Sequence, residues 1–375
     1  MTDLANNLND IIKDLSLKQE LTQATFLNHN LNKSKFCVMP FTSIILEPDG
    51  NIGVCRHKGS KFTFGNIRTQ SLDEIWQSEK VQEWRNDFHA GDIKVCQTEI
   101  IDIKCNQCPE LNKMMPFAEI QNIKSPKILR LTANFNGKCN LQCQMCDIWK
   151  SPNGFYTEEN FWIPARKKLF HEILEVDFLS GEPFIQSDTY KLINEITKVN
   201  PNCQWSFTTN AHWLLTEVVK RDLDKISIKN IILSVDSLKE STYHKIRFPG
   251  DLNFALNNVE NLLTYQKERL EKNLSSLNLR LNCLIQKDNW QEARDVIHFC
   301  AKRKIIPFLT FLYEPSQYSL LNYNYDQRKE ILDFYFETLS PTELLFVQRI
   351  IKPLVRSLSR IDYAYYLSKL QGLAC

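Results

Sequence analysis

Three cysteines, Cys139, Cys143 and Cys146, lie close together in the stretch GKCNLQCQMCDIW, which spans residues 137–149. Their spacing is Cys-x3-Cys-x2-Cys, and thiolates are soft ligands that suit zinc or an iron–sulfur cluster. A structural zinc site is closed by four ligands, and a four-iron cluster needs four as well. Three thiolates therefore leave one coordination position for a small molecule, which indicates a reactive site.

The whole chain has 375 residues, twelve of them cysteine, and a net charge of +2. Its first residues are rich in acids and amides and lack the apolar core of a secretory signal. No apolar run has the length of a membrane span. We therefore expect a cytoplasmic protein, in which clustered cysteines hold metals more often than disulfides. The small net charge and the lack of a basic module with stacking aromatics argue against a nucleic acid partner.

The elements that must position the three cysteines alternate between strands and helices from residue 127 to residue 315. This alternation predicts an α/β fold with a parallel sheet and right-handed crossovers. Six units fit a partial (β/α)6 barrel of the TIM type better than a closed barrel of eight. The cysteine loop follows the first strand, at the edge where such folds place their chemistry. We expect strands near 128–135, 175–181, 203–210, 230–237, 277–285 and 307–314, and helices near 188–199, 213–226, 252–272 and 290–304.

The remaining chain divides into three further segments. Residues 1–35 are polar with weak helical periodicity, and we expect an arm or a helix. Residues 36–115 contain a predicted hairpin, FTSIILEPDGNIGVCR, and a helix over residues 71–88 that Ser71 and Glu74 would cap. Residues 316–375 are expected to form a helical extension, with breaks at Pro341 and Pro353.

The cysteine loop resembles the cluster loop of radical S-adenosylmethionine (SAM) enzymes, including Met145 before the last cysteine. The resemblance implies a [4Fe-4S] cluster held by Cys139, Cys143 and Cys146, with SAM bound at the open iron and Met145 beside it. An electron from the cluster would cleave SAM to methionine and a 5′-deoxyadenosyl radical, which takes hydrogen from the substrate. An electron donor such as flavodoxin or ferredoxin would then be a partner.

A second motif, LSGEPF at residues 179–184, ends the second expected strand. It resembles the Gly-Gly-Glu motif of the same family, with Ser180 in place of the first glycine. The resemblance implies that Ser180, Gly181 and Glu182 bind the SAM ammonium group, for which a carboxylate is a suitable partner. The alternative is an ordinary turn after a strand, with Glu182 in solvent.

Further candidates for the SAM pocket follow the third, fourth and fifth expected strands. Ser234, Asp236 and Arg247 resemble the Ser-x-Asp stretch and following arginine of the family, which implies contacts to the ribose and the SAM carboxylate. Asp236 could instead cap a helix, and Arg247 could lie on the surface. The third strand offers Thr209 and Asn210, and the fifth offers Asn282 and Leu284.

A second block of cysteines precedes the expected barrel. Cys37, Cys55, Cys105 and Cys108 would give four thiolates from a hairpin and a Cys-x2-Cys loop, which suits zinc or an iron–sulfur cluster. The block is similar to the auxiliary-cluster units called SPASM or twitch domains, here placed before the barrel. Cys96 could be a fifth ligand or a bystander.

Together these patterns predict a radical SAM enzyme that removes hydrogen from a substrate with the help of an auxiliary iron–sulfur cluster. We expect modification or oxidation of a peptide or protein. A dehydrogenase or epimerase of a small metabolite is the alternative within the family. The alternative from another class is a non-enzymatic interaction protein in which both cysteine blocks hold zinc.

Overall fold

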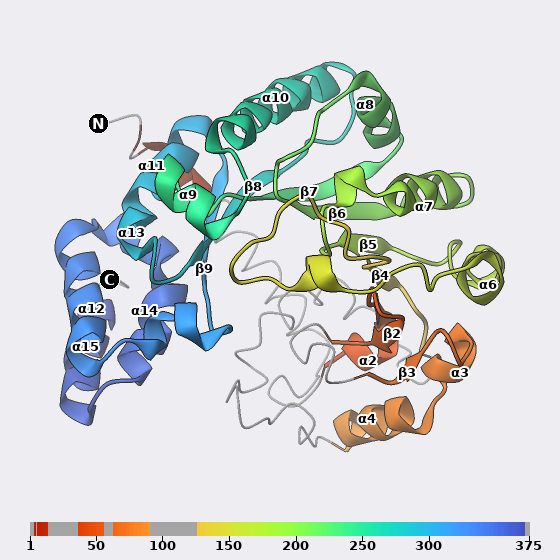
Figure 1. Cartoon of the computed structure of the whole chain (residues 1–375), viewed down its shortest axis with the longest axis horizontal. Helices are drawn as coiled ribbons and strands as arrows, with labels where there is room; N and C mark the ends of the chain where they lie inside the picture. The colour runs from red at the N-terminus through yellow and green to blue at the C-terminus, as the bar shows by residue number, and fades with distance from the viewer. Residues whose placement is uncertain (1–3, 5, 14–36, 56–62, 91–125, 372–375) are drawn as a thin grey trace.

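A computed structural model describes residues 4, 6–13, 37–55, 63–90 and 126–371 of the chain (Figure 1). The described residues form one sheet of nine strands in the order β3-β2-β1-β4-β5-β6-β7-β8-β9. The six strands predicted after residue 127 are all present, and neighbouring strands among them pair in parallel. They are β4 (Arg130–Ala133), β5 (Glu175–Phe178), β6 (Gln204–Thr209), β7 (Ser227–Ser234), β8 (Leu279–Ile285) and β9 (Ile306–Phe311).

One face of this parallel sheet is apolar and packs against helices. Along β8, Leu281, Cys283 and Ile285 are fully buried, whereas Asn282 and Leu284 between them are only half-buried. Because successive side chains of a strand point to opposite faces, the two sets lie on opposite sides of the sheet. In Figure 1 the helices lie around the outside of the strands. They are α6 (Ile163–Lys168), α7 (Ser187–Thr197), α8 (Glu217–Asp224), α9 (Glu240–Ile246), α10 (Leu252–Glu271) and α11 (Ala293–Arg303).

The other face of the sheet is polar, and we name it the lumenal face. Its residues are neighbours in the strand register: Thr132 pairs with Asp177, and Asp177 pairs with Ser206. Arg130 Nε donates to Asp177 Oδ2 over 2.9 Å. The lumenal face therefore carries charged and amide groups, with apolar side chains such as Leu284 and Phe308 among them. Its members also include Glu175, Asn230, Arg280, Asn282, Phe308 and Thr310.

The predicted N-terminal hairpin is present and extends the same sheet. Strands β1 (Ser43–Leu46) and β2 (Asn51–Gly53) are antiparallel, and β1 pairs in parallel with β4. The predicted helix over residues 71–88 divides at Gln77, although the capping box of Ser71 and Glu74 is formed as expected. The other elements of this unit are α2 (Met39–Thr42), β3 (Gly65–Asn66), α3 (Leu72–Trp76) and α4 (Glu79–His89).

The C-terminal segment is helical, as predicted, and its helices gather beside β9 in Figure 1. Pro341 begins a helix, but the predicted break at Pro353 is wrong, because this proline lies inside a continuous helix. The apolar side of that helix is buried, and this packing offsets the hydrogen bond that a proline cannot donate. The helices are α12 (Tyr325–Thr338), α13 (Pro341–Phe346), α14 (Gln348–Arg356) and α15 (Arg360–Gln371).

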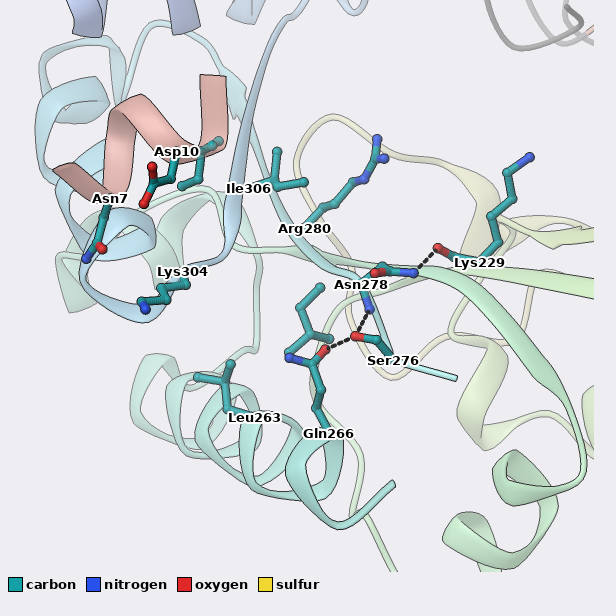
Figure 2. A pocket seen from close by; sticks show the side chains of 12 residues that line it. Asn7, Asp10, Lys229, Leu263, Gln266, Ser276, Asn278, Arg280, Lys304 and Ile306 are labelled. Atoms are coloured by element: carbon teal, nitrogen blue, oxygen red, sulfur yellow. Dashed lines mark hydrogen bonds between the residues drawn. The ribbon is translucent and has the colours of Figure 1, made fainter. Parts of the chain in front are cut away.

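A cavity of about 510 Å³ lies beside the amino ends of β8 and β9 (Figure 2). Asn7 and Asp10 border it on one side, and Gln266 of α10 borders it on another. Parallel α/β folds gather their chemistry at the carboxyl ends of the strands, so this cavity is not where the site is expected. Among the described residues, no helix combines the length and the apolar character that a membrane crossing requires.

Candidate active site

The three cysteines of the first motif lie in the loop that follows β4, which we name the cluster loop (residues 134–150). All three thiols are half-buried. The two ends of the loop meet at Gly137, where an added Cβ would lie 2.0 Å from the carbonyl oxygen of Ile148. Only glycine allows this approach, so Gly137 lets the two ends of the loop come together on either side of the cysteines.

The surroundings of the thiols disfavour their charged form until a metal binds them. Burial raises the pKa of Cys143 to about 11 and also raises the pKa of Cys139. Three donors face these sulfurs: Arg247 Nη1 lies 3.8 Å from Cys143 Sγ, while Asn210 Nδ2 and Leu141 N lie 3.6 Å and 3.4 Å from Cys139 Sγ. Hydrogen bonds of this kind to ligand sulfurs are one way in which proteins tune iron–sulfur clusters.

Within the described ranges, no three His, Cys, Asp or Glu side chains are arranged to hold a single metal ion. Three half-buried thiols with donors aimed at two of their sulfurs fit the larger cluster that the motif implies.

Glu182 lies at the carboxyl edge of the sheet and is fully buried, so the alternative of a solvent-exposed residue is wrong. Its carboxylate accepts hydrogen bonds from Thr209 Oγ1 at 2.8 Å, from Asn210 N at 2.7 Å and from Phe184 N at 3.2 Å. Among the described residues no cation lies within ion-pair distance of it. Burial raises the pKa of Glu182 to about 7, although these hydrogen bonds oppose the rise. A buried carboxylate without a cation is a suitable receptor for an ammonium group.

The motif that contains Glu182 is joined directly to the cluster loop. Glu182 N donates to Lys138 O over 2.9 Å. Gly181 has a φ of +61°, and an added Cβ there would lie 2.2 Å from the same Lys138 oxygen. Ser180 Oγ donates to the carbonyl oxygen of Asn136 over 3.2 Å. The serine in place of the family's glycine therefore adds a hydrogen bond to the loop.

Gln186, which the sequence analysis did not identify, strengthens the same junction. Its side chain is buried, and its amide nitrogen lies 3.0 Å from both Lys138 O and Ser180 O. The residue lies two positions after the end of the motif, and a single sequence gives no sign that its side chain turns back. Gln186 is thus a positioning residue that holds the motif against the cluster loop.

Thr209 and Asn210 are brought to the site, but both act on protein groups rather than facing an open pocket. Thr209 holds Glu182, as described above, and accepts from Trp213 Nε1 over 2.7 Å. Asn210 Nδ2 donates to Asn140 Oδ1 over 2.9 Å, and its own oxygen accepts from His212 N. The structure therefore gives these two residues a supporting role between Glu182 and the cluster loop.

A third attachment of the cluster loop runs through the segment around Arg247. Gln142 N donates to Phe248 O over 2.6 Å, and Gln144 N donates to Ile246 O over 2.9 Å. These two bonds hold Arg247 beside the loop and away from the surface, with only 7% of the residue exposed.

Asp236 is buried beneath Arg247 and forms an ion pair with it, 2.7 Å from Oδ2 to Nε. Although burial by itself would lower the pKa of Arg247, the Asp236 carboxylate raises it above its usual range. The other Asp236 oxygen accepts from Leu284 N over 2.7 Å. Asp236 is therefore a positioning residue for Arg247, and the alternatives of a helix cap and a surface arginine are both wrong.

The remaining candidates lie near the same edge. Ser234 pairs with Asn282 in the sheet, and Asn282 Oδ1 accepts from Thr310 Oγ1 over 3.0 Å. The Ser234 hydroxyl has no hydrogen bond in the described part of the chain, which leaves it available to a ligand. Met145 is half-buried within the cluster loop.

Cys37 and Cys55 of the second block flank the hairpin on the side away from the cluster loop. Cys37 precedes β1, and Cys55 follows β2, so both stand at the same end of the antiparallel hairpin. Because β1 runs parallel to β4, this end adjoins the amino end of β4, whereas the cluster loop leaves its carboxyl end. Cys96, Cys105 and Cys108 lie outside the described residues.

Two family models match the chain. Residues 133–306 match the model described as the radical SAM superfamily, and residues 37–109 match SPASM, described as an iron–sulfur cluster-binding domain. The second match includes the cysteines of the N-terminal block.

Two relatives with curated names are similar to parts of the chain. A GTP 3′,8-cyclase of Clostridium botulinum is 31% identical over 146 residues, which is 37% of this chain and 44% of that protein. A probable GTP 3′,8-cyclase of Methanocaldococcus jannaschii is 25% identical over 252 residues, covering 65% and 75% of the two chains. The chain thus spans less than half the length of the first relative.

Among solved structures, Streptococcus suis SuiB bound to the precursor peptide SuiA aligns with a TM-score of 0.42 and 15% identity. The alignment covers 80% of this chain and 68% of SuiB. A structure of TYW1 with a lysine-pyruvate adduct aligns with a TM-score of 0.33 over 54% of this chain and 71% of TYW1, at 14% identity.

Proposed function

This chain contains a radical SAM domain with a SPASM domain N-terminal to it, and we propose that it removes hydrogen from a peptide or protein substrate. The two domains imply a [4Fe-4S] cluster, SAM and an auxiliary iron–sulfur cluster. When bound, cluster and SAM supply a 5′-deoxyadenosyl radical that takes a hydrogen atom from the substrate. The observation that carries the proposal is the buried carboxylate of Glu182, without a cation and joined to the loop of three thiols.

Each residue of the site has a proposed task. Cys139, Cys143 and Cys146 would hold three irons of the cluster, and Glu182 would accept hydrogen bonds from the SAM ammonium group. Arg247 is held beside Cys143, where it would face the SAM carboxylate while Asp236 keeps it charged and oriented. In this arrangement the protein supplies binding and orientation through groups that gather beyond the carboxyl ends of the strands, as such cofactor chemistry requires.

The lumenal face favours a substrate with amide and charged groups over a nucleoside triphosphate. A triphosphate is bound by several cations that are free to face it. In the described residues Arg130 is already paired with Asp177 at 2.5 Å, and Lys229 is paired with Glu175. A nucleotide is the second candidate substrate, because the relatives are named GTP 3′,8-cyclase. Consumption of GTP by the reconstituted protein would favour it.

The activity is tested with protein that has been reconstituted anaerobically with iron and sulfide. With dithionite and SAM it should form 5′-deoxyadenosine and methionine. Protein with its full iron content that forms neither product would reject the proposal. Mass spectrometry of peptides from cells that express active or inactive enzyme then tests the substrate class, because oxidation removes hydrogen and changes the peptide mass.

Replacing Glu182 with Gln should weaken SAM binding without loss of cluster iron, measured by equilibrium dialysis against reconstituted protein. The change removes a charged hydrogen-bond acceptor, an interaction of about 1.5–3 kcal/mol. In the wild type, affinity should fall as pH drops below about 7, because Glu182 becomes protonated there and must lose that proton to accept an ammonium group. The Gln variant should lack this pH dependence, and equal affinity and slope in both proteins would contradict the assignment.

Replacing both Cys37 and Cys55 with Ala should remove about half of the iron, because two clusters would reduce to one. SAM cleavage should persist, since the cluster loop keeps its three thiols. Substrate turnover should fail. The amino-edge position of these cysteines favours a second cluster that accepts an electron from the substrate radical over one that binds the substrate directly. Unchanged iron, measured by a colorimetric assay, would exclude both residues as ligands.

A further inference from the structure

Arg349, on α14 of the C-terminal extension, reaches the lumenal face of the sheet. Its guanidinium carbon lies 4.4 Å from the centre of the Phe308 ring. Phe308 pairs with Asn282 in the register of β8 and β9, and Asn282 in turn pairs with Ser234. Arg349 is therefore on the row of lumenal side chains that includes the unpartnered Ser234 hydroxyl.

The cation of Arg349 has no anionic partner among the described residues. In the described part of the chain it makes no hydrogen bond and no ion pair. Arg130 and Arg247 differ, because each has a carboxylate oxygen within 3 Å, from Asp177 and Asp236 respectively.

Solvent reaches the Arg349 side chain, yet the surrounding protein still lowers its pKa below the usual range. The guanidinium group is therefore partly desolvated, while the residue remains accessible to a ligand. The cation–π contact with Phe308 also restricts where the guanidinium group lies, and such a contact with the ring does not use its N–H donors.

We infer that Arg349 binds a carboxylate or phosphate group of the substrate at the lumenal face. The planar guanidinium group binds such oxyanions through two parallel hydrogen bonds, and here the contact with Phe308 already holds the group at the lumenal face. This inference rests on the proposed function, because it takes the bound anion to be part of the substrate. It extends that function by requiring an anionic group, such as an acidic side chain or the carboxyl end of a peptide. The residue lies outside the matched radical SAM region, so it belongs to the part of the chain that can differ with the substrate.

The inference is tested by calorimetry of the reconstituted protein without reductant. N-acetylglutamate and its neutral diamide form one pair of probes, and GTP and guanosine form the other. The first pair tests a carboxylate source and the second a phosphate source. At least one anion should bind more tightly than its neutral partner. Arg349→Met should weaken that anion about 10-fold to 100-fold, as expected for a charged hydrogen bond, and Arg349→Lys should weaken it less.

Arg356→Met is the matched control, because this exposed arginine lies on the same helix and borders a different cavity, between α14 and α15. It should bind both anions as the wild type does. The inference is overturned if neither anion binds better than its neutral partner, or if the Arg349 and Arg356 variants behave alike. Because no reductant is present, this result is separate from the test of SAM cleavage, and either can fail while the other stands.

Discussion

Protein in which Cys139, Cys143 and Cys146 are all replaced by Ala should form no 5′-deoxyadenosine with dithionite and SAM, and should lose the iron of the first cluster. The three thiols are half-buried in a loop, whereas the core is built from the apolar faces of strands and helices. The variant should therefore remain folded, with the circular dichroism of the wild type. The reason for the complete loss is chemical, since no other thiol follows β4 in the loop.

Cys203→Ala is the control for this experiment, because Cys203 is 1% exposed and packs in the core. Its replacement should lower the unfolding temperature, as expected for a buried side chain that is shortened, but keep both the iron and the activity. Undiminished 5′-deoxyadenosine formation by the triple variant would refute the assignment of the cluster loop.

Gly181→Ala is the second change with a large expected effect, and it should reduce SAM cleavage at least about 100-fold. A misplacement of about 1 Å at a site can cost this much, and the new Cβ would have to move the Lys138 carbonyl from 2.2 Å. That carbonyl accepts the Glu182 N–H, so the shift separates the carboxylate from the cluster loop. The left-handed backbone adds a cost of about 1–2 kcal/mol.

Gly154→Ala separates the effect of the contact with Lys138 from the cost of the left-handed backbone. Gly154 also has a positive φ of +85°, but an added Cβ there meets nothing within 4 Å. It should lose stability without losing activity, and both variants are compared by thermal unfolding and by initial rate. Equal activity in the two variants would show that the contact with Lys138 does not matter.

The strands of the barrel could be predicted from sequence because their signals are local. Segments such as LNLRLNCLI alternate apolar and polar residues, and β8 is where the pattern places it. The division of the helix after residue 71 and the continuity of α14 through Pro353 were not predictable, since both depend on packing against distant residues.

The candidate site was predictable to the extent that its residues occur in motifs. Glu182 and Arg247 do face the cluster loop, but sequence could not show that Asp236 is the partner of Arg247, which requires the folded contact. Gln186 and Arg349 were missed for the same reason. A lone glutamine before a helix, or a lone arginine within one, carries no sign of where its side chain ends.

The parallel pairing of β1 with β4 makes the N-terminal unit part of the barrel's architecture. Strand β1 covers the backbone groups of β4 that would otherwise form an open edge, and open edges invite pairing between chains and aggregation. During synthesis, residues 43–46 cannot pair until residues 130–133 have emerged. This part of the sheet therefore forms only through a contact that is distant in sequence. A fragment that begins at residue 126 would retain every motif of the SAM pocket but expose β4. We therefore expect that the hairpin of the N-terminal unit limits self-association of the chain.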